Sequence, residues 1–159
     1  MKSPAASDMV VISSAQDALA QVGQTLGVGR WHVVTQDMVN RFAQATGDDQ
    51  WIHVDPVRAA SGPFGCCIAH GLLTLSLAGG SLFQEVVKVQ AQMGVNYGCD
   101  RVRYPAPVPV GSRIRGSAHM TNATLMGPTG VQCSVRITVD IEHAAKPACV
   151  ADFIVRYEF

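Results

Sequence analysis

The chain has 159 residues and a formal net charge of zero, since 12 Lys and Arg balance 12 Asp and Glu. We interpret it as one domain over residues 1–159, because a chain of this size buries roughly 70% of the surface that it exposes when unfolded. No block of like charge occurs, so neither nucleic acid nor an anionic membrane is an expected partner. The five cysteines include no Cys-x-x-Cys pair, which favours reduced thiols in a cytoplasmic protein.

The apolar segments predict neither a signal peptide nor a membrane span. Residues 1–8 carry one basic side chain, and only four apolar residues, Met9–Ile12, follow them. A signal peptide has a longer apolar core. The longest apolar-rich stretch, Ile68–Val87, contains several polar residues and the pair Gly79-Gly80. It therefore predicts a core helix and not a membrane span.

Residues 1–30 predict a helical N-terminal extension of the same domain. Ser14, with Asp17 three residues later, is a helix-capping pattern. The apolar spacing after Ser14 predicts a short helix that ends near Gly27 or Gly29.

A short strand over Trp31–Val34 and a second helix come next. Thr35 is a suitable N-cap for this helix, and Gly47 ends it. Its buried face is predicted by the i, i+3, i+4, i+7 spacing of Val39, Phe42, Ala43 and Thr46. Asp55-Pro56 predicts one more helical turn, which runs to Ala60 and places proline where its missing N–H is tolerated.

The rest of the chain predicts one central helix and a sheet. From Gly71 to about Val87 the apolar residues surround the whole helical circumference, which predicts a helix buried on most sides. After Met93 the apolar period changes to two. The predicted strands are 95–104, 113–120, 131–141 and 149–157, with a hairpin at 126–130. Consecutive antiparallel strands and one buried helix predict an α+β fold in which the sheet curls around the helix.

Asp48 and His53 are candidate acid–base residues, because they stand five residues apart just after the predicted second helix. Each has an ordinary explanation when taken alone. An acid that follows a helix-ending glycine is usually a turn or capping residue, and a histidine here is usually a loop residue. Their joint spacing favours a catalytic pair.

The motif around this pair resembles that of MaoC-like (R)-specific enoyl-CoA hydratases, in the NodN-like branch with a single hot-dog domain. Gly47, Asp48, Ile52, His53 and Asp55 keep the places of the motif. Gln50 and Trp51 stand where Asn and Pro are more typical, which bears on the loop shape and the acyl specificity. The resemblance runs from about residue 31 to the C-terminus.

This resemblance implies a fold, a reaction and a mechanism. The fold is the hot-dog fold, an antiparallel sheet wrapped around a long central helix. The reaction is the reversible syn addition of water to trans-2-enoyl-CoA, which gives (R)-3-hydroxyacyl-CoA. Asp48 and His53 would hold one water between them and exchange its protons with the substrate. The resemblance implies no metal or redox cofactor. Coenzyme A is a part of the substrate.

Gly71 opens the predicted central helix and is the candidate for binding the thioester oxygen. N–H groups at a helix N-terminus suit an oxygen that gains negative charge, and glycine lets a thioester approach the backbone closely. Further candidates for substrate binding are Gln50, Trp51, His70 and Ser76. Ser76 matches a pocket serine of hydratase relatives, whereas His70 is better explained as a packed and hydrogen-bonded residue at the helix start.

Arg101 and Arg103 precede a Pro-rich block, 105–111, that resembles the second sequence block of MaoC proteins. These arginines are candidates for binding a phosphate of coenzyme A, although outward arginines on a strand are usually only solvated. Cys66-Cys67 near His70 are interpreted as buried thiols and not as a metal site, because adjacent cysteines point apart.

Two other functions remain open. A hot-dog acyl-CoA thioesterase would hydrolyse the same class of substrate with a carboxylate base, and fold alone does not separate it from a hydratase. His53, which a thioesterase does not need, favours hydration. The other alternative is a non-catalytic module that binds acyl-CoA or an acyl carrier. In each case we expect a homodimer, because a sheet curled around a helix leaves an edge to be covered.

Overall fold

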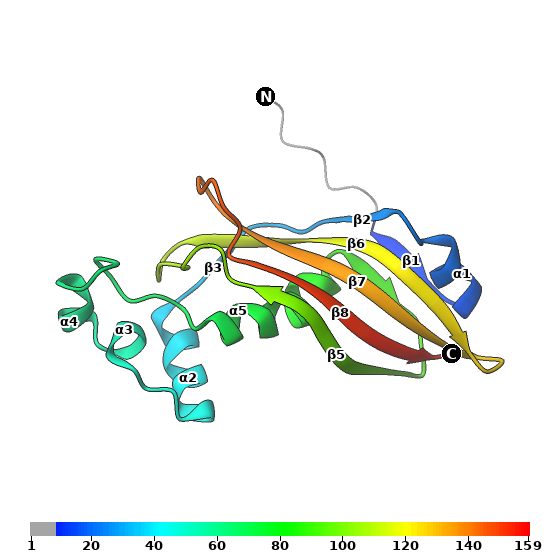
Figure 1. Cartoon of the computed structure of the whole chain (residues 1–159), viewed down its shortest axis with the longest axis horizontal. Coiled ribbons are helices and arrows are strands. Elements are labelled where there is room, and N and C mark those ends of the chain that lie inside the picture. Colours follow the sequence, from blue (N-terminus) through cyan, green and yellow to red (C-terminus); the bar gives the residue numbers. More distant parts are fainter. Residues whose placement is uncertain (1–8) are drawn as a thin grey trace.

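The computed structural model describes residues 9–159, and the expectation drawn from residues 1–8 lies outside this range. Its main sheet has strands in the order β2-β6-β7-β8-β5, and the short strand β3 also pairs with β6. All of these pairings are antiparallel. The strands are β2 Thr25–Val28, β3 His32–Val33, β5 Met93–Arg103, β6 Arg113–Met126, β7 Gly130–Ile141 and β8 Cys149–Glu158. The sheet curls around helix α5, Gly71–Leu77 (Figure 1), so the predicted α+β arrangement is confirmed.

The period-two pattern of the second half correctly predicts the strands. In β7 the apolar residues Val131, Cys133, Val135, Ile137 and Val139 are buried and alternate with more exposed polar ones. Met126 pairs with Gly130 across the predicted hairpin. The buried residues of β6, β7 and β8 form one core with the inner helix. Leu73 of α5 is a member of this core, so the helix packs directly against the sheet.

The central helix is shorter than predicted and is kinked. After α5 the chain forms a π-helical turn, η1, over Ala78–Leu82, and Gly80 has non-helical dihedrals of −106° and −112°. Val87 already begins strand β4, Val87–Val89, so the prediction of one helix from 71 to 87 is wrong. The reason is the pair Gly79-Gly80: glycine permits the unusual backbone, and a Cβ at residue 79 would lie 2.4 Å from the Phe153 ring.

The prediction that this helix is buried on most sides also fails at its first turns. Leu72 is 59% exposed, and Ser76 is exposed as well. Leu73, Ala78 and Leu82 face the core. An exposed leucine on the central helix leaves apolar surface for another molecule or a second chain to cover.

Near the N-terminus, the predicted cap is right and the predicted helix end is wrong. Ser14 accepts a hydrogen bond from the backbone N–H of Asp17 at 3.1 Å, and helix α1 spans Ala15–Ala20. The helix stops before residue 21, and Thr25–Val28 instead extends the sheet beside β6. A second unpredicted strand, β1 Val10–Ile12, pairs in parallel with β4. Both are short strands that depend on distant partners.

Three helices beyond the end of the sheet carry the segment with the candidate residues Asp48 and His53 (Figure 1). Helix α2, Gln36–Thr46, is capped by Thr35 and ends at Gly47, whose φ of 78° is left-handed. Helix α4, Pro56–Ala60, is capped by the Asp55 carboxylate. These features confirm the predictions, except that Thr46 is exposed and not part of the buried face. Between them lies helix α3, Trp51–Val54, which the sequence reading treats as loop.

Among the described residues, none of the helices has both the length and the apolar character that a membrane span requires.

Candidate active site

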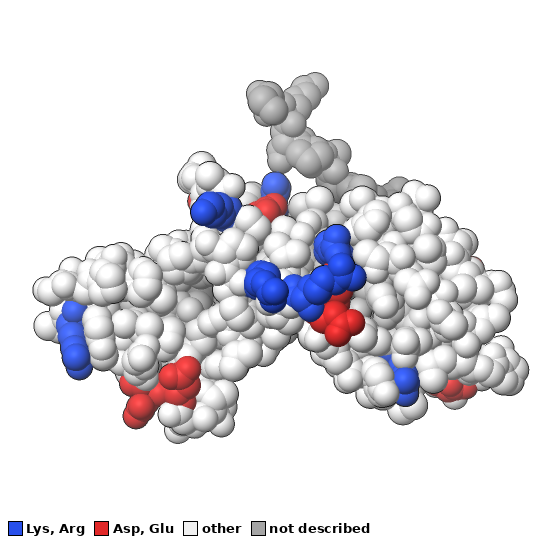
Figure 2. Space-filling model, in the orientation of Figure 1, with Lys and Arg blue, Asp and Glu red and all other residues white. Residues whose placement is uncertain are grey.

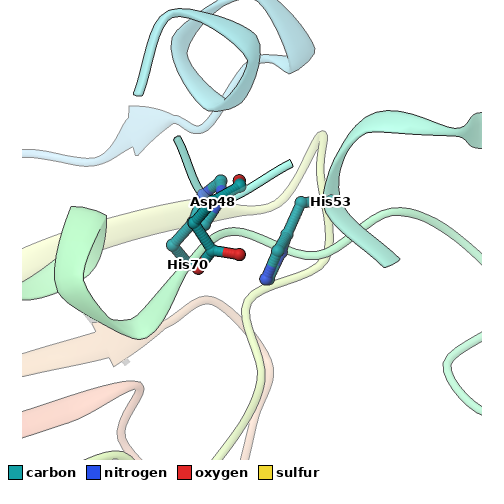
Figure 3. Close-up of side chains that lie close together, drawn as sticks. All are labelled: Asp48, His53 and His70. Atoms are coloured by element: carbon teal, nitrogen blue, oxygen red, sulfur yellow. The ribbon is translucent and has the colours of Figure 1, made fainter. Parts of the chain in front are cut away.

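Asp48, His53 and His70 come together where the α2–α3 connection meets the start of α5 (Figure 3). Gly47 ends α2 with a left-handed turn, and Asp48 follows outside the helix. The short helix α3 then places His53 close to the Asp48 side chain. One donor atom from each of the three side chains lies within 4.8 Å of the others. His53 and His70 are 7% and 2% exposed, whereas Asp48 is exposed. The predicted pair is therefore assembled in space.

A backbone carbonyl defines the tautomer of His53. The Nδ1 atom of His53 lies 2.7 Å from the carbonyl oxygen of Ile68. A carbonyl oxygen only accepts, so Nδ1 carries the proton and donates it. In the neutral imidazole the Nε2 atom is then left with a lone pair. Gln36 adds a second restraint, since its side-chain amide donates to the His53 carbonyl at 2.7 Å. His53 thus presents an oriented proton acceptor.

His70 lies against His53 and also contacts the backbone of Asp48. The rings of His53 and His70 are stacked, with centroids 3.8 Å apart and planes inclined by 26°. The Nε2 atom of His70 donates to the Asp48 carbonyl oxygen at 2.9 Å. Its Nδ1 atom is buried and has no hydrogen-bond partner within residues 9–159. The preferred explanation of His70, a packed and hydrogen-bonded residue at the helix start, is therefore confirmed, and its ring contacts the candidate pair.

A pocket of about 300 Å³ opens beside His53. This volume is at the small end of the range for ligand sites. Its walls are mainly apolar, and its lining residues are His53, Phe64, Ile68, Ala69, Gly71, Thr74, Tyr104, Ala106, Pro107, Val108 and Ala148. Gly71 is the first residue of α5, where the N–H has no intrahelical partner. The pocket therefore brings a candidate oxyanion donor and the His53 ring to the same space.

Tyr104 is a wall of this pocket that sequence reasoning missed. A Cβ added at Gly71 would lie 3.1 Å from the Tyr104 ring, so the ring packs against the start of α5. Burial raises the pKa of the Tyr104 phenol. In the sequence, one feature indicates a functional role for Tyr104, namely its position directly before the Pro-rich block. Phe64 and Thr74 line the same pocket and carried no signal of their own.

Gln50, Trp51 and Ser76 do not line this pocket. Gln50 is exposed at the start of α3, and the Trp51 ring lies close to Gly62 and under the guanidinium of Arg58, 4.5 Å from the ring centroid. The Ser76 hydroxyl is exposed and donates to the carbonyl of Leu72 at 2.8 Å. Within one chain these three predicted residues thus make local contacts.

The two candidate phosphate-binding arginines stand near the end of strand β5. Figure 2 shows basic and acidic side chains gathered in the middle of one face of the molecule. Arg101 pairs with the Asp152 carboxylate at 3.1 Å, and Arg136 holds the same carboxylate with two bonds of 2.7 and 2.9 Å. Hydrogen bonding by Arg136 lowers the pKa of Asp152. The Arg103 guanidinium donates to the carbonyl of Val102 and is exposed.

The residue types in the cluster also suit a transition metal, because two imidazoles and a carboxylate are common ligands. The stacking of His53 and His70 argues against a metal site. Lone pairs lie in the ring planes, and two nearly parallel rings do not direct them to one point. Cys67 is a buried free thiol, as predicted, and burial raises its pKa. Cys66 is only partly buried, so the prediction of a buried thiol is wrong at this position.

Comparison with solved structures defines the fold. A monoamine oxidase regulatory protein from Archaeoglobus fulgius matches with a TM-score of 0.78 at 23% identity, covering 94% of this chain and 97% of that one. The (R)-hydratase from A. caviae involved in PHA biosynthesis matches with a TM-score of 0.69 at 23% identity, covering 84% and 94%. The chain therefore has the hot-dog fold, as predicted.

Comparison of sequences defines the family. The model of the MaoC like domain matches residues 17–141. The chain is 48% identical over 149 residues to 3-hydroxyacyl-thioester dehydratase Z of Mycobacterium tuberculosis, with 94% of this chain and 99% of the relative covered. It is 44% identical over 148 residues to nodulation protein N of Rhizobium meliloti, with 92% of each covered. The chain belongs to the MaoC-like dehydratase family.

Proposed function

We propose that the protein is an (R)-specific enoyl-CoA hydratase, a hydro-lyase that adds water reversibly to trans-2-enoyl-CoA. The observation that carries this proposal is the Asp48 carboxylate close to His53, whose Nδ1–H is occupied by the Ile68 carbonyl and whose ring lines an apolar pocket. The similarity to a 3-hydroxyacyl-thioester dehydratase over 94% of the chain supports it. The reaction requires no cofactor, and coenzyme A enters as a portion of the substrate.

In this mechanism Asp48 and His53 hold one water against the Cβ atom of the substrate. Water is a poor nucleophile, so one of the two side chains removes a proton as the C–O bond forms. The Cα atom receives a proton on the same face, which makes the addition syn. Since the two groups lie within 4.8 Å of each other and share one water in this mechanism, either can be the formal base.

Negative charge that develops on the thioester oxygen is met by the N–H of Gly71. In other enzymes, an oxyanion donor of this kind lowers the activation barrier by about 3 kcal/mol. The acyl chain lies among the apolar walls of the pocket, where Tyr104 faces the same glycine.

Gly71→Val is expected to lower turnover with crotonyl-CoA by about a hundredfold. A valine side chain would occupy the approach of the thioester and would also press on the Tyr104 ring, 3.1 Å from an added Cβ. Gly71→Ala in a Tyr104→Ala background relieves the ring contact, so it separates loss of substrate approach from loss of packing. Steady-state kinetics with circular dichroism make the test, and full activity in a folded Gly71→Val protein would contradict the assignment.

We also propose that Arg101 and Arg103 bind a phosphate of coenzyme A. Both stand on β5 shortly before Tyr104, a wall of the pocket. Arg101 is engaged by Asp152, whereas Arg103 donates only to the neighbouring carbonyl of Val102. Arg103 therefore has more freedom to meet a phosphate.

The active form is expected to be a homodimer with the sites near the subunit boundary. Strand β5 pairs with β8 on one side and lies at the end of the strand order, so its other edge is unpaired within residues 9–159. Large apolar side chains on this strand are exposed: Met93, Val95 and Tyr97. A second chain would cover them and add a wall that excludes water from the site.

Light scattering is expected to give twice the 16.9 kDa mass of the chain. Val95→Lys on the open edge should shift the protein toward monomer, whereas Val57→Lys, at an 85% exposed position of α4, should not. A monomeric wild-type protein at micromolar concentration would refute this assembly. The location is proposed to be cytoplasmic, which the five unpaired cysteines support.

The proposed reaction is tested with crotonyl-CoA, by following the absorbance of the enoyl thioester and free thiol in parallel. A hydratase removes the enoyl absorbance and releases no thiol. Release of thiol would instead identify a thioesterase. Binding of crotonyl-CoA with neither change would identify a non-catalytic module.

A further inference from the structure

His70 makes two contacts with the proposed catalytic pair, yet it does not line the substrate pocket. Its ring is 2% exposed and is stacked on His53 at 3.8 Å. A second ring, that of Phe42, lies 5.0 Å from it. The proposed mechanism gives this buried polar side chain no chemical step, so its position calls for another explanation.

The segment that carries Asp48 has weak local restraints. Residues 47–50 form no helix or strand. The Asp49 N–H reaches the Gly47 carbonyl at 3.2 Å, and the Asp48 N–H lies 3.4 Å from the Thr46 hydroxyl, which is long for a hydrogen bond. The bond from His70 Nε2 to the Asp48 carbonyl is shorter, at 2.9 Å, and joins residues 22 positions apart. It ties the Asp48 backbone to the start of α5.

The same side chain also restrains His53. The Ile68 carbonyl holds one edge of the His53 ring through Nδ1, but a single hydrogen bond leaves the ring free to tilt about it. The stacked His70 ring removes this freedom because it covers one face of His53. Asp48 and His53 belong to one segment of the chain, and His70 contacts both of them from another.

We propose that His70 is a positioning residue that sets the distance between the Asp48 carboxylate and His53 Nε2. Resting on the proposed function, this inference assigns His70 a role through the pair and not through the substrate. Misplacement of a reacting group by about 1 Å can cost about a hundredfold in rate. Loss of the His70 contacts should therefore lower kcat and leave KM nearly unchanged.

Two variants of similar size separate the hydrogen bond from simple packing. His70→Leu fills the space but cannot donate to the Asp48 carbonyl. His70→Gln places an amide N–H near the position of Nε2 and can donate. With crotonyl-CoA, kcat should fall about a hundredfold in His70→Leu and stay within about tenfold in His70→Gln. If His70→Leu does not fold, His70→Asn replaces it, because its shorter amide falls short of the carbonyl.

Nuclear magnetic resonance of the ligand-free protein gives a readout that does not need activity. The imidazole nitrogen signals should place the proton on Nε2 of His70 and on Nδ1 of His53. The amides of residues 47–50 should exchange faster in His70→Leu or His70→Asn, and at the wild-type rate in His70→Gln. A purely structural role would lower the melting temperature of all variants without separating Gln from the others.

These two readouts distinguish the failures. If the wild type does not hydrate crotonyl-CoA and residues 47–50 still loosen as expected, the proposed function is wrong and the positioning role stands. If the wild type is active and His70→Leu has the same kcat as His70→Gln, the positioning role is overturned. Unchanged amide exchange at residues 47–50 in His70→Leu overturns it as well.

Discussion

Asp48→Asn is expected to lower turnover of crotonyl-CoA by about a hundredfold to ten-thousandfold, or about 3 to 5 kcal/mol of barrier. Asparagine keeps the shape of the side chain and the backbone bond from His70 to the Asp48 carbonyl, but it cannot accept the proton of the water. The loss should therefore appear in kcat, with little change in the melting temperature. Steady-state kinetics and thermal unfolding of the same preparation make the measurement.

Asp49→Asn is the matched control, because it makes the same change one residue away. Asp49 lines a different and open groove, formed with Asn40, Gln44 and Val54 of helices α2 and α3. The activity of the Asp49→Asn variant should stay within a few-fold of wild type. An essential Asp49 beside a dispensable Asp48 would show that the motif is aligned wrongly by one position.

The sheet could be predicted because its physical cause is visible in short windows of sequence. One face of β7 is buried and the other meets water, so polar and apolar residues alternate along it. The caps of α2 and α4 could also be predicted from the sequence, because Thr35 and Asp55 accept hydrogen bonds from N–H groups three residues away. A feature that depends on neighbouring residues therefore leaves a pattern in a short stretch of sequence.

Features that depend on distant contacts left no such pattern. Strand β1 has three residues and exists because it pairs with β4, more than seventy positions away. The kink at Gly80 depends on how closely Phe153 packs on Gly79. A run of apolar residues cannot show either effect, so it predicted one long helix.

The candidate site divides in the same way. Asp48 and His53 lie on one segment, so their spacing after the helix-ending Gly47 predicted that they meet. The contact of Tyr104 with Gly71 and the bond from His70 to Asp48 join separate segments. The two residues of the proposed acid–base pair could be identified from the sequence, whereas the residues that hold and surround them could not.

His53→Gln is expected to cost about a hundredfold to ten-thousandfold in turnover, as Asp48→Asn does. Glutamine places its amide near the position of Nε2, and this amide cannot take up a proton from water, while the Ile68 carbonyl loses its Nδ1 donor. His143→Gln is the control, because the His143 side chain is 90% exposed and should stay within a few-fold of wild type. The measurement is kcat with crotonyl-CoA, accompanied by a free-thiol assay.

The double variant Asp48→Asn/His53→Gln tests whether the two side chains act on the same water. If they do, removal of the first already disables the step that the second serves, so the combined loss should be far smaller than the product of the two single losses. Losses that multiply would mean that the side chains act in separate steps. If His53 is dispensable and crotonyl-CoA loses its thioester but keeps its double bond, the protein is a thioesterase and not a hydratase. A carboxylate base alone is sufficient for thioester hydrolysis.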